Sequence, residues 1–107
     1  MSYARRVDGN HAEIRDGLRA AGYTVLDLSK AACGIPDILA LSKCGASVFM
    51  EIKMPGEKLT DAERKFHAIY TGLCCVVFSL EDALDKLEKI DRRAGYDPAE
   101  DEAWKNL

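Results

Sequence analysis

Three charged residues at the ends of two apolar segments are the most informative feature of this chain. Asp37 follows a glycine–isoleucine–proline stretch and opens the apolar run 38–41, while Glu51 and Lys53 close the next apolar segment. Burying such charges is costly unless they are paired or bound to a metal ion. Two carboxylates and a lysine are also the parts of a metal-dependent phosphodiesterase site. The sequence therefore directs attention to the ends of these two segments.

Strand geometry predicts that the three residues share one face of a sheet. Glu51 and Lys53 are two positions apart, so their side chains project from the same side of a strand. The three-residue loop 43–45, which ends in Gly45, is typical of a hairpin with a type I turn followed by a left-handed residue. In that register Asp37 lies directly opposite Glu51.

Directly opposed carboxylates repel each other, because the Cβ atoms of such cross-strand pairs are only about 5 Å apart. A divalent cation between Asp37 and Glu51 would remove this penalty. Hard oxygen ligands with room for water suit Mg²⁺ or Mn²⁺ better than zinc. The alternative is that Asp37 caps a loop, while Glu51 and Lys53 are ordinary residues on a solvated strand face. A glutamate and a lysine at this spacing are common, so only the turn, the spacing and the parity together favour a site.

Hydrophobic periodicity and capping residues predict the elements that must position this group. The predicted order is a helix from Asn10 as N-cap to Gly22, strands over 23–29, 37–42 and 47–53, a helix from Thr60 to Gly72, a strand over 73–78, and a helix from Ser79 to Ile90. The last strand is a continuous apolar run, so we expect it to be central and covered on both faces. This αβββαβα order predicts an α/β fold with a mixed central sheet flanked by helices.

The bulk composition indicates a single soluble domain. Among 107 residues we expect one domain over 1–90, followed by an acidic extension over 91–107. No apolar stretch is long enough to span a bilayer, and four cysteines without a secretory signal favour a cytoplasmic protein with reduced thiols. The net charge is −4 over residues 81–107 and +1 over 1–80, which neither supports nor excludes nucleic acid as a partner.

Taken together, these features resemble the PD-(D/E)xK nuclease superfamily. The chain looks most like the small virus-type replication-repair nuclease (VRR-NUC) domains, relatives of archaeal-type Holliday junction resolvases. The resemblance runs from about Asn10 to about Leu87 and implies a restriction-endonuclease-like core. It rests on a helix glutamate (Glu13), Gly34-Ile35-Pro36-Asp37, Glu51-Ile52-Lys53, the Leu59-Thr60 helix start, Gly72 and the final apolar strand.

The resemblance implies a metal site for Mg²⁺ or Mn²⁺ formed by Asp37, Glu51 and the backbone carbonyl of Ile52. Glu13 would contribute to it directly or through water. Lys53 would orient or activate the attacking water and stabilise negative charge on the phosphate. This division is chemically sensible, because a bound metal ion polarises the phosphoryl oxygen while the lysine is a fixed cation beside it.

Two positions keep an alternative explanation. Glu13 could instead be the N3 partner of an Asn10 cap. Family members usually carry glutamine where this chain has Glu63, and Glu63 could ion-pair with Lys53 or complete a capping box with Thr60. Basic residues that could contact phosphate, although a solvated surface is their default role, are Lys30, Lys58, Arg64 and Lys65.

The expected function is therefore a metal-dependent DNA endonuclease that cuts phosphodiester bonds in Holliday junctions or other branched DNA during replication, recombination or repair. A two-fold homodimer is expected, because cutting two strands needs two sites. A bacterial or phage-encoded chain would fit, and no membrane partner is expected. The alternative is a catalytically silent nucleic-acid-binding or subunit module that keeps the nuclease fold. Intact Asp37, Glu51 and Lys53 argue against this alternative, while Glu63 and the weak positive charge argue for it.

Overall fold

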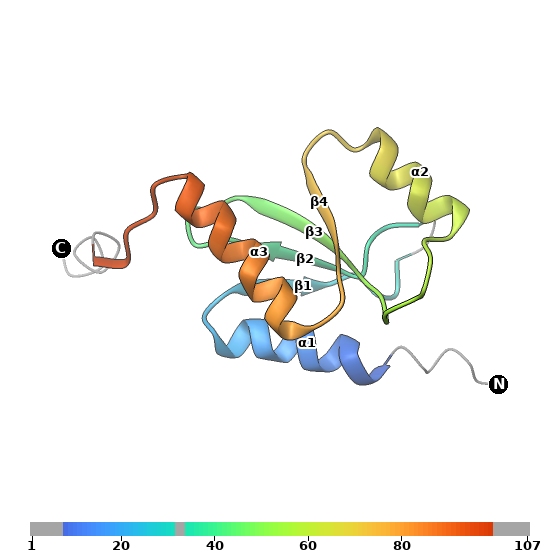
Figure 1. The fold of residues 1–107 in the computed structure, drawn as a ribbon, viewed down its shortest axis with the longest axis horizontal. Coiled ribbons are helices and arrows are strands. Elements are labelled where there is room, and N and C mark those ends of the chain that lie inside the picture. The colour runs from blue at the N-terminus through green and yellow to red at the C-terminus, as the bar shows by residue number, and fades with distance from the viewer. Residues whose placement is uncertain (1–7, 32–33, 100–107) are drawn as a thin grey trace.

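The helices and strands occur in the order that the sequence predicts. The computed structural model describes residues 8–31 and 34–99. Four strands form one mixed sheet in the order β1-β2-β3-β4, with β1–β2 and β2–β3 antiparallel and β3–β4 parallel. The fold is therefore α/β (Figure 1). Its elements are α1 (Asp8–Ala20), β1 (Thr24–Asp27), β2 (Ile38–Leu41), β3 (Ser47–Ile52), α2 (Asp61–Ile69), β4 (Leu73–Val77) and α3 (Leu80–Arg93).

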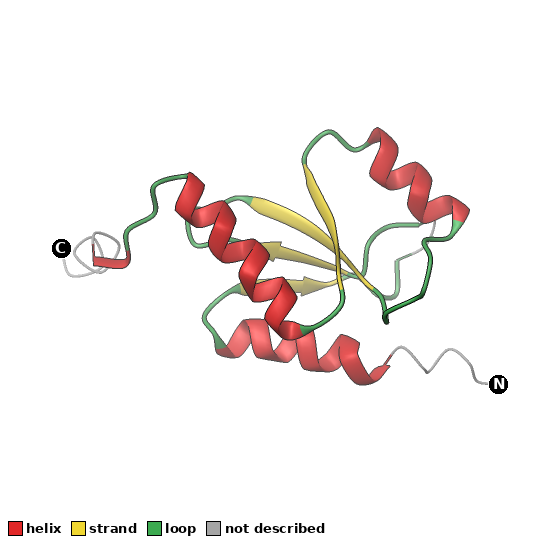
Figure 2. Ribbon diagram, in the orientation of Figure 1, coloured by secondary structure: helices red, strands yellow, loops and turns green. Residues whose placement is uncertain are grey.

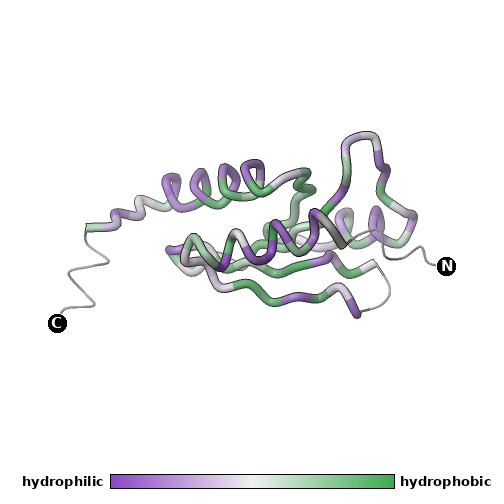
Figure 3. The backbone as a smooth tube through the Cα atoms, turned by 90° about the horizontal axis from the view of Figure 1, so that it is seen from below, coloured by the Kyte–Doolittle hydropathy of each residue, from purple (hydrophilic) through white to green (hydrophobic). Residues whose placement is uncertain are grey.

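The hydrophobic core lies between the sheet and the helices α1 and α3, which pack against each other (Figure 2). Figure 3 shows that α3 carries hydrophilic residues on its side away from the sheet, as an amphipathic helix should. A fully buried Leu, Ile or Met side chain contributes about 1.5–3 kcal/mol relative to an exposed one. The core residues are Ile14, Leu18, Tyr23, Val25, Ile38, Ala40, Val48, Met50, Val77, Ala83 and Leu87.

No helix within residues 8–31 and 34–99 is long and apolar enough to cross a membrane. Of the three, α2 stands apart from α1 and α3 (Figure 1) and has no buried residue of its own. Its N-cap is Thr60, as predicted, and Ser79 caps α3 in the same way. Local capping chemistry therefore fixes where both helices begin.

The β2–β3 hairpin has the register that the sequence predicts. Ile38 pairs with Met50, and both side chains are fully buried in the core. Gly45 has a φ of 93°, in the left-handed region that this turn requires and that glycine adopts without strain. Continued by one position, the same pairing sets Asp37 opposite Glu51.

The hairpin turn is held by Asp91 of α3, whose side chain is buried. Its two carboxylate oxygens accept hydrogen bonds from the backbone N–H groups of Lys43 and Cys44, each at 2.9 Å. Burial opposes ionisation, but these hydrogen bonds outweigh it and hold the pKa of Asp91 below its ordinary value. The last helix thus continues past residue 90, where we expected the domain to end. Through Asp91 it contacts the turn between β2 and β3.

The predicted position of the last strand is wrong. β4 lies at the edge of the sheet, and among the described strands it pairs with β3 alone. Leu73 at its start is 43% exposed, and only Val77 is buried. A continuous apolar run predicts a strand, but it does not reveal which strands will flank it, because pairing is a long-range property.

The predicted start of the first helix is also wrong. α1 already includes Asp8, so Asn10 lies within the helix instead of capping it. A residue that favours caps marks a helix boundary only to within a turn, because the preceding residues can adopt helical backbone as well. The second explanation for Glu13, as the N3 partner of an Asn10 cap, is excluded with it.

Replacing Asp91 with asparagine should lower the free energy of unfolding by about 1–3 kcal/mol, because an amide nitrogen would face a backbone N–H in a partly buried contact. The folded pKa of Asp91 lies below the ordinary value of 3.8. The stabilisation is therefore fully present above that value and is lost as pH falls through the folded pKa. Urea unfolding at about pH 7 and about pH 3 should show the two proteins converging in acid.

The matched control is Asp85→Asn on the same helix, where the side chain is 52% exposed and pairs with Lys89. This substitution should change stability by well under about 1 kcal/mol. Equal losses in the two variants would show that Asp91 does not hold the hairpin turn.

Candidate active site

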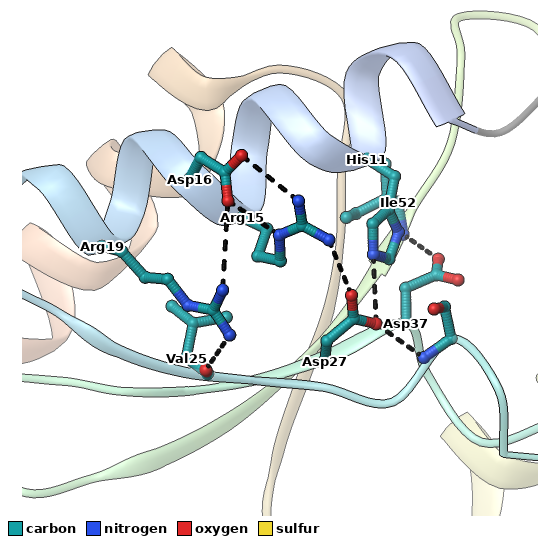
Figure 4. A network of polar contacts seen from close by, with 9 residues as sticks. His11, Arg15, Asp16, Arg19, Val25, Asp27, Asp37 and Ile52 are labelled. Atoms are coloured by element: carbon teal, nitrogen blue, oxygen red, sulfur yellow. Dashed lines mark hydrogen bonds and ion pairs between the residues drawn. The ribbon is translucent and has the colours of Figure 1, made fainter.

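Asp37 and Glu51 come together where β2 begins and β3 ends. Asp37 directly precedes β2, and Glu51 is the penultimate residue of β3 with only 3% of its surface exposed. The two carboxyl groups are within hydrogen-bonding contact of each other. Asp37 Oδ2 also accepts a hydrogen bond from the backbone N–H of Ile52 at 2.8 Å (Figure 4). The structure thus brings together the two acidic residues that the sequence singled out.

Two carboxylates this close cannot both ionise without a large penalty. Burial, followed by the hydrogen bond and the negative charge of Asp37, raises the pKa of Glu51 from 4.5 to about 9, although Lys53 acts in the opposite direction. Glu51 Oε1 is buried and has no hydrogen-bond partner within the described residues. The pair can therefore share a proton or, in its place, hold a cation.

Lys53 extends from the end of β3 to Glu63 in the first turn of α2. Its Nζ lies 2.9 Å from Glu63 Oε1, and this same oxygen accepts a hydrogen bond from the backbone N–H of Thr60 at 2.8 Å. Both roles that the sequence allowed for Glu63, ion pair and capping box, are therefore present together. Burial disfavours the ammonium group, but the hydrogen bond and charge of Glu63 outweigh it, and the pKa of Lys53 is raised.

Gly34 allows the loop before Asp37 to approach the first turn of α2. Its φ is 78°, and a Cβ at this position would lie 2.5 Å from the backbone of Ala62. No residue with a side chain could make this approach without displacing α2. The glycine of the sequence motif therefore couples the position of α2 to that of Asp37.

An aromatic cluster packs the C-terminal end of α2 against β3 of the sheet. Phe66 and Tyr70 meet Phe49 of β3 edge-on, with ring centroids 5.2 Å and 5.0 Å away from its centroid. Edge-to-face pairs of this kind contribute about 0.5–1.5 kcal/mol beyond the area they bury. Together with the Gly34 contact, the cluster sets the position of Glu63 relative to Lys53.

Glu13 shows no hydrogen bond or ion pair to this group among the described residues, so its part in a metal site stays a prediction. Its side chain is exposed on α1, whereas His11, two positions earlier, is buried. His11 Nε2 lies 3.3 Å from Asp27 Oδ1, and Arg15 donates to the other oxygen of Asp27 at 2.9 Å (Figure 4). The sequence did not predict this network. The one available signal was the spacing of His11 and Arg15, which places both on one helix face.

The basic residues proposed as phosphate contacts are all exposed. Arg64 is engaged at the start of its own helix, where it donates to the carbonyl of Leu59 at 3.0 Å and pairs with Asp61. Lys30 follows β1, Lys58 precedes α2 and Lys65 lies on α2. Contact of these side chains with a nucleic acid stays a prediction.

Within residues 8–31 and 34–99, no three histidine, cysteine, aspartate or glutamate side chains are arranged to hold a metal ion. The oxygen donors that meet at the candidate site are instead the two carboxylates of Asp37 and Glu51, and the main-chain carbonyl of Ile52 stays a predicted third ligand. Such a set leaves the remaining positions of a cation to water and substrate, which is how Mg²⁺ is usually bound in proteins.

No protein-family model, curated protein or solved structure gives a significant match to this chain. A function must therefore be inferred from the chemistry of the site. The arrangement consists of a buried glutamate (Glu51) against a half-buried aspartate (Asp37), with one glutamate oxygen that has no hydrogen-bond partner among the described residues. Lys53 lies beside this pair, and a further glutamate, Glu63, holds the lysine.

Replacing Glu51 with glutamine should stabilise the protein in EDTA at neutral and alkaline pH. The pKa of Glu51 in the folded state lies above its usual value, so the folded protein binds the extra proton, and stability falls as pH rises from 4.5 towards 9. Glutamine has no proton to lose and should flatten this slope. Thermal unfolding at several pH values between these limits would measure it.

The control for this measurement is Glu81→Gln, at an exposed position of α3, which should leave the slope unchanged. If wild type and the Glu51→Gln variant lose stability equally as pH rises, Asp37 and Glu51 do not form a proton-sharing pair.

Proposed function

We propose that this chain is a metal-dependent DNA endonuclease of the PD-(D/E)xK type, similar to VRR-NUC domains and with their restriction-endonuclease-like core. The observation that carries the proposal is the contact of the buried carboxyl group of Glu51 with the half-buried carboxyl group of Asp37, beside Lys53. Opposed acidic side chains reduce stability, and such local conflicts are expected at functional sites. Binding a cation that acts on phosphate is the use that best fits these residue types.

The donor set suits Mg²⁺ or Mn²⁺. Asp37 and Glu51 offer carboxylate oxygens, and the carbonyl of Ile52 could complete the protein's share of the ligands. Oε1 of Glu51 has no hydrogen-bond partner among residues 8–31 and 34–99, which supports this fit, because a buried acceptor without a donor is otherwise costly. Bound there, the ion would polarise the phosphoryl oxygen and lower the pKa of a bound water.

Besides a bound metal ion, the side chain of Lys53 would supply positive charge at the site. Its ammonium group is held beside Glu63 with a raised pKa, so it is a cation at neutral pH. A fixed cation can orient an attacking water and stabilise the charge that develops on the phosphate. Because it stays protonated, Lys53 is better suited to these tasks than to accepting a proton.

Branched DNA as the substrate and a two-fold homodimer belong to the proposal through the resemblance. One site cuts one strand, so cutting two strands at a junction takes two copies of this chain. The catalytically silent module is the second candidate. One observation favours it, since Glu63 neutralises Lys53 where a phosphate would have to approach.

Wild-type protein should cleave plasmid or four-way-junction DNA with Mg²⁺ or Mn²⁺ and not in EDTA. Asp37→Asn should reduce cleavage by roughly 100-fold or more, because the site loses a charged ligand while the variant can still accept the Ile52 hydrogen bond. Asp61→Asn, a fully solvated position on α2, is the matched control and should cleave normally.

Gel assays of the three proteins at equal concentration provide the comparison. Full activity of the Asp37→Asn variant would remove Asp37 from the site. Absence of cleavage by wild type with both metals, across junction, fork, flap and single-stranded DNA, would leave the silent module as the function.

Metal binding should also raise the thermal midpoint of wild type. A ligand that binds only the folded state adds about 2.7 kcal/mol at a concentration of 100 times its Kd. Differential scanning fluorimetry with millimolar Mg²⁺ or Mn²⁺ should therefore show an upward shift for wild type and for Asp61→Asn. The shift should vanish for Glu51→Gln. A shift that survives in Glu51→Gln would mean that the ion binds elsewhere.

A further inference from the structure

Glu63 uses one carboxylate oxygen for two contacts that belong to different parts of the fold. Oε1 accepts the backbone N–H of Thr60 at 2.8 Å, which is a contact within the capping box of α2. The same atom lies 2.9 Å from Nζ of Lys53, at the end of β3. A single atom thus connects the start of a helix with the lysine of the proposed nuclease site.

The ion pair lies in a partly enclosed place. The side chain of Lys53 is 12% exposed and that of Glu63 is 16% exposed. Salt screens such a pair less than one on the open surface. The pair is therefore expected to persist in solution, unlike most crystallographic pairs between fully exposed side chains.

Holding a lysine in one conformation has a cost that must be met before catalysis. Ordering this long side chain costs about 1.5–2 kcal/mol of rotamer entropy. An ammonium group has three donors, so the bond to Glu63 leaves two for a phosphate oxygen or a water. A partner that fixes the side chain in advance leaves less ordering to be done when substrate arrives.

Glu63 is itself fixed by contacts that do not involve Lys53. Its backbone N–H donates to Thr60 Oγ1 at 3.2 Å, which completes the capping box. Gly34 abuts the neighbouring residue Ala62, and the aromatic cluster holds the far end of α2. The carboxylate of Glu63 is therefore held beside Lys53 by a helix whose position is fixed by other contacts.

We propose that Glu63 is a positioning residue, which fixes Lys53 through the same oxygen that caps α2. This inference rests on the proposed nuclease function and assigns Glu63 no contact with the substrate. If this inference is correct, removing the carboxylate of Glu63 slows DNA cleavage more than removing the α2 cap alone does. The competing explanation is that Glu63 serves the helix alone.

Three substitutions separate these roles. Thr60→Val removes the Oγ1 acceptor of the cap but keeps the backbone N–H of residue 60 and the Glu63–Lys53 pair. Glu63→Ala removes both the cap contact and the ion pair. Glu63→Gln keeps an oxygen that can accept from both groups but has no charge. Thr60→Val is therefore the matched control for loss of the cap.

The thermal midpoint in EDTA should fall in both Thr60→Val and Glu63→Ala. Only Glu63→Ala should lower kcat for DNA cleavage, by about 10-fold or more, without raising KM, since supporting residues of this kind typically contribute 10–100-fold. Glu63→Gln should recover part of the lost kcat. Equal kcat losses in Thr60→Val and Glu63→Ala, or an unchanged kcat in Glu63→Ala, would overturn the proposal.

A second measurement does not depend on activity. In metal-free protein labelled with ¹⁵N-lysine, an ammonium group held in an ion pair exchanges its protons slowly enough to give an NMR signal. The Lys53 signal should be present in wild type and Thr60→Val and lost in Glu63→Ala. If it persists in Glu63→Ala, Glu63 does not fix Lys53. Absence of cleavage by wild type would refute the nuclease function instead, and the NMR comparison would still decide whether Glu63 holds the lysine.

Discussion

Side chains alternate along a strand, so a shift of one residue in the pairing of β2 with β3 would exchange the two faces of the hairpin. Ile38 would leave the core, and Asp37 would no longer stand opposite Glu51. The core and the candidate site therefore depend on the same register. Two features fix it, the left-handed Gly45 in the turn and the carboxylate of Asp91 that binds the turn's backbone.

The same register creates an electrostatic cost that the rest of the structure only partly offsets. Glu51 is buried against a second acid, and its orphaned oxygen finds no donor in the described part of the chain. The positive charge of Lys53 favours the ionised form of Glu51, but the ammonium group of Lys53 is paired with Glu63. Local conflict of this kind, within an otherwise consistent fold, is what functional sites show when binding or catalysis takes precedence over stability.

The sequence was most informative where structure is determined locally. The parity of Asp37 and Glu51 follows from the three-residue turn, and the helix start at Thr60 follows from its capping box, so both could be predicted. The edge position of β4 and the contact of His11 with Asp27 depend on residues far apart in the chain. They left no periodic signal, which is why they were missed or predicted wrongly.

Glu63 lies between these two cases. Its sequence position offered a cap or an ion pair, each a plausible local choice, and nothing in the spacing indicated that one oxygen would make both contacts. That outcome depends on the position of α2, which is fixed by the close approach of Gly34 and by the aromatic rings that contact Phe49. Long-range packing thus decides what a local motif is used for.

The contact between Asp91 and the hairpin also imposes an order on events during synthesis. The hydrogen bond from Lys43 to Asp91 joins positions 48 residues apart. Both strands of the hairpin are synthesised before α3, so until α3 is available the turn lacks the two hydrogen bonds that Asp91 accepts. A nascent chain that stops short of α3 would hold its two acidic side chains in a hairpin still able to slip.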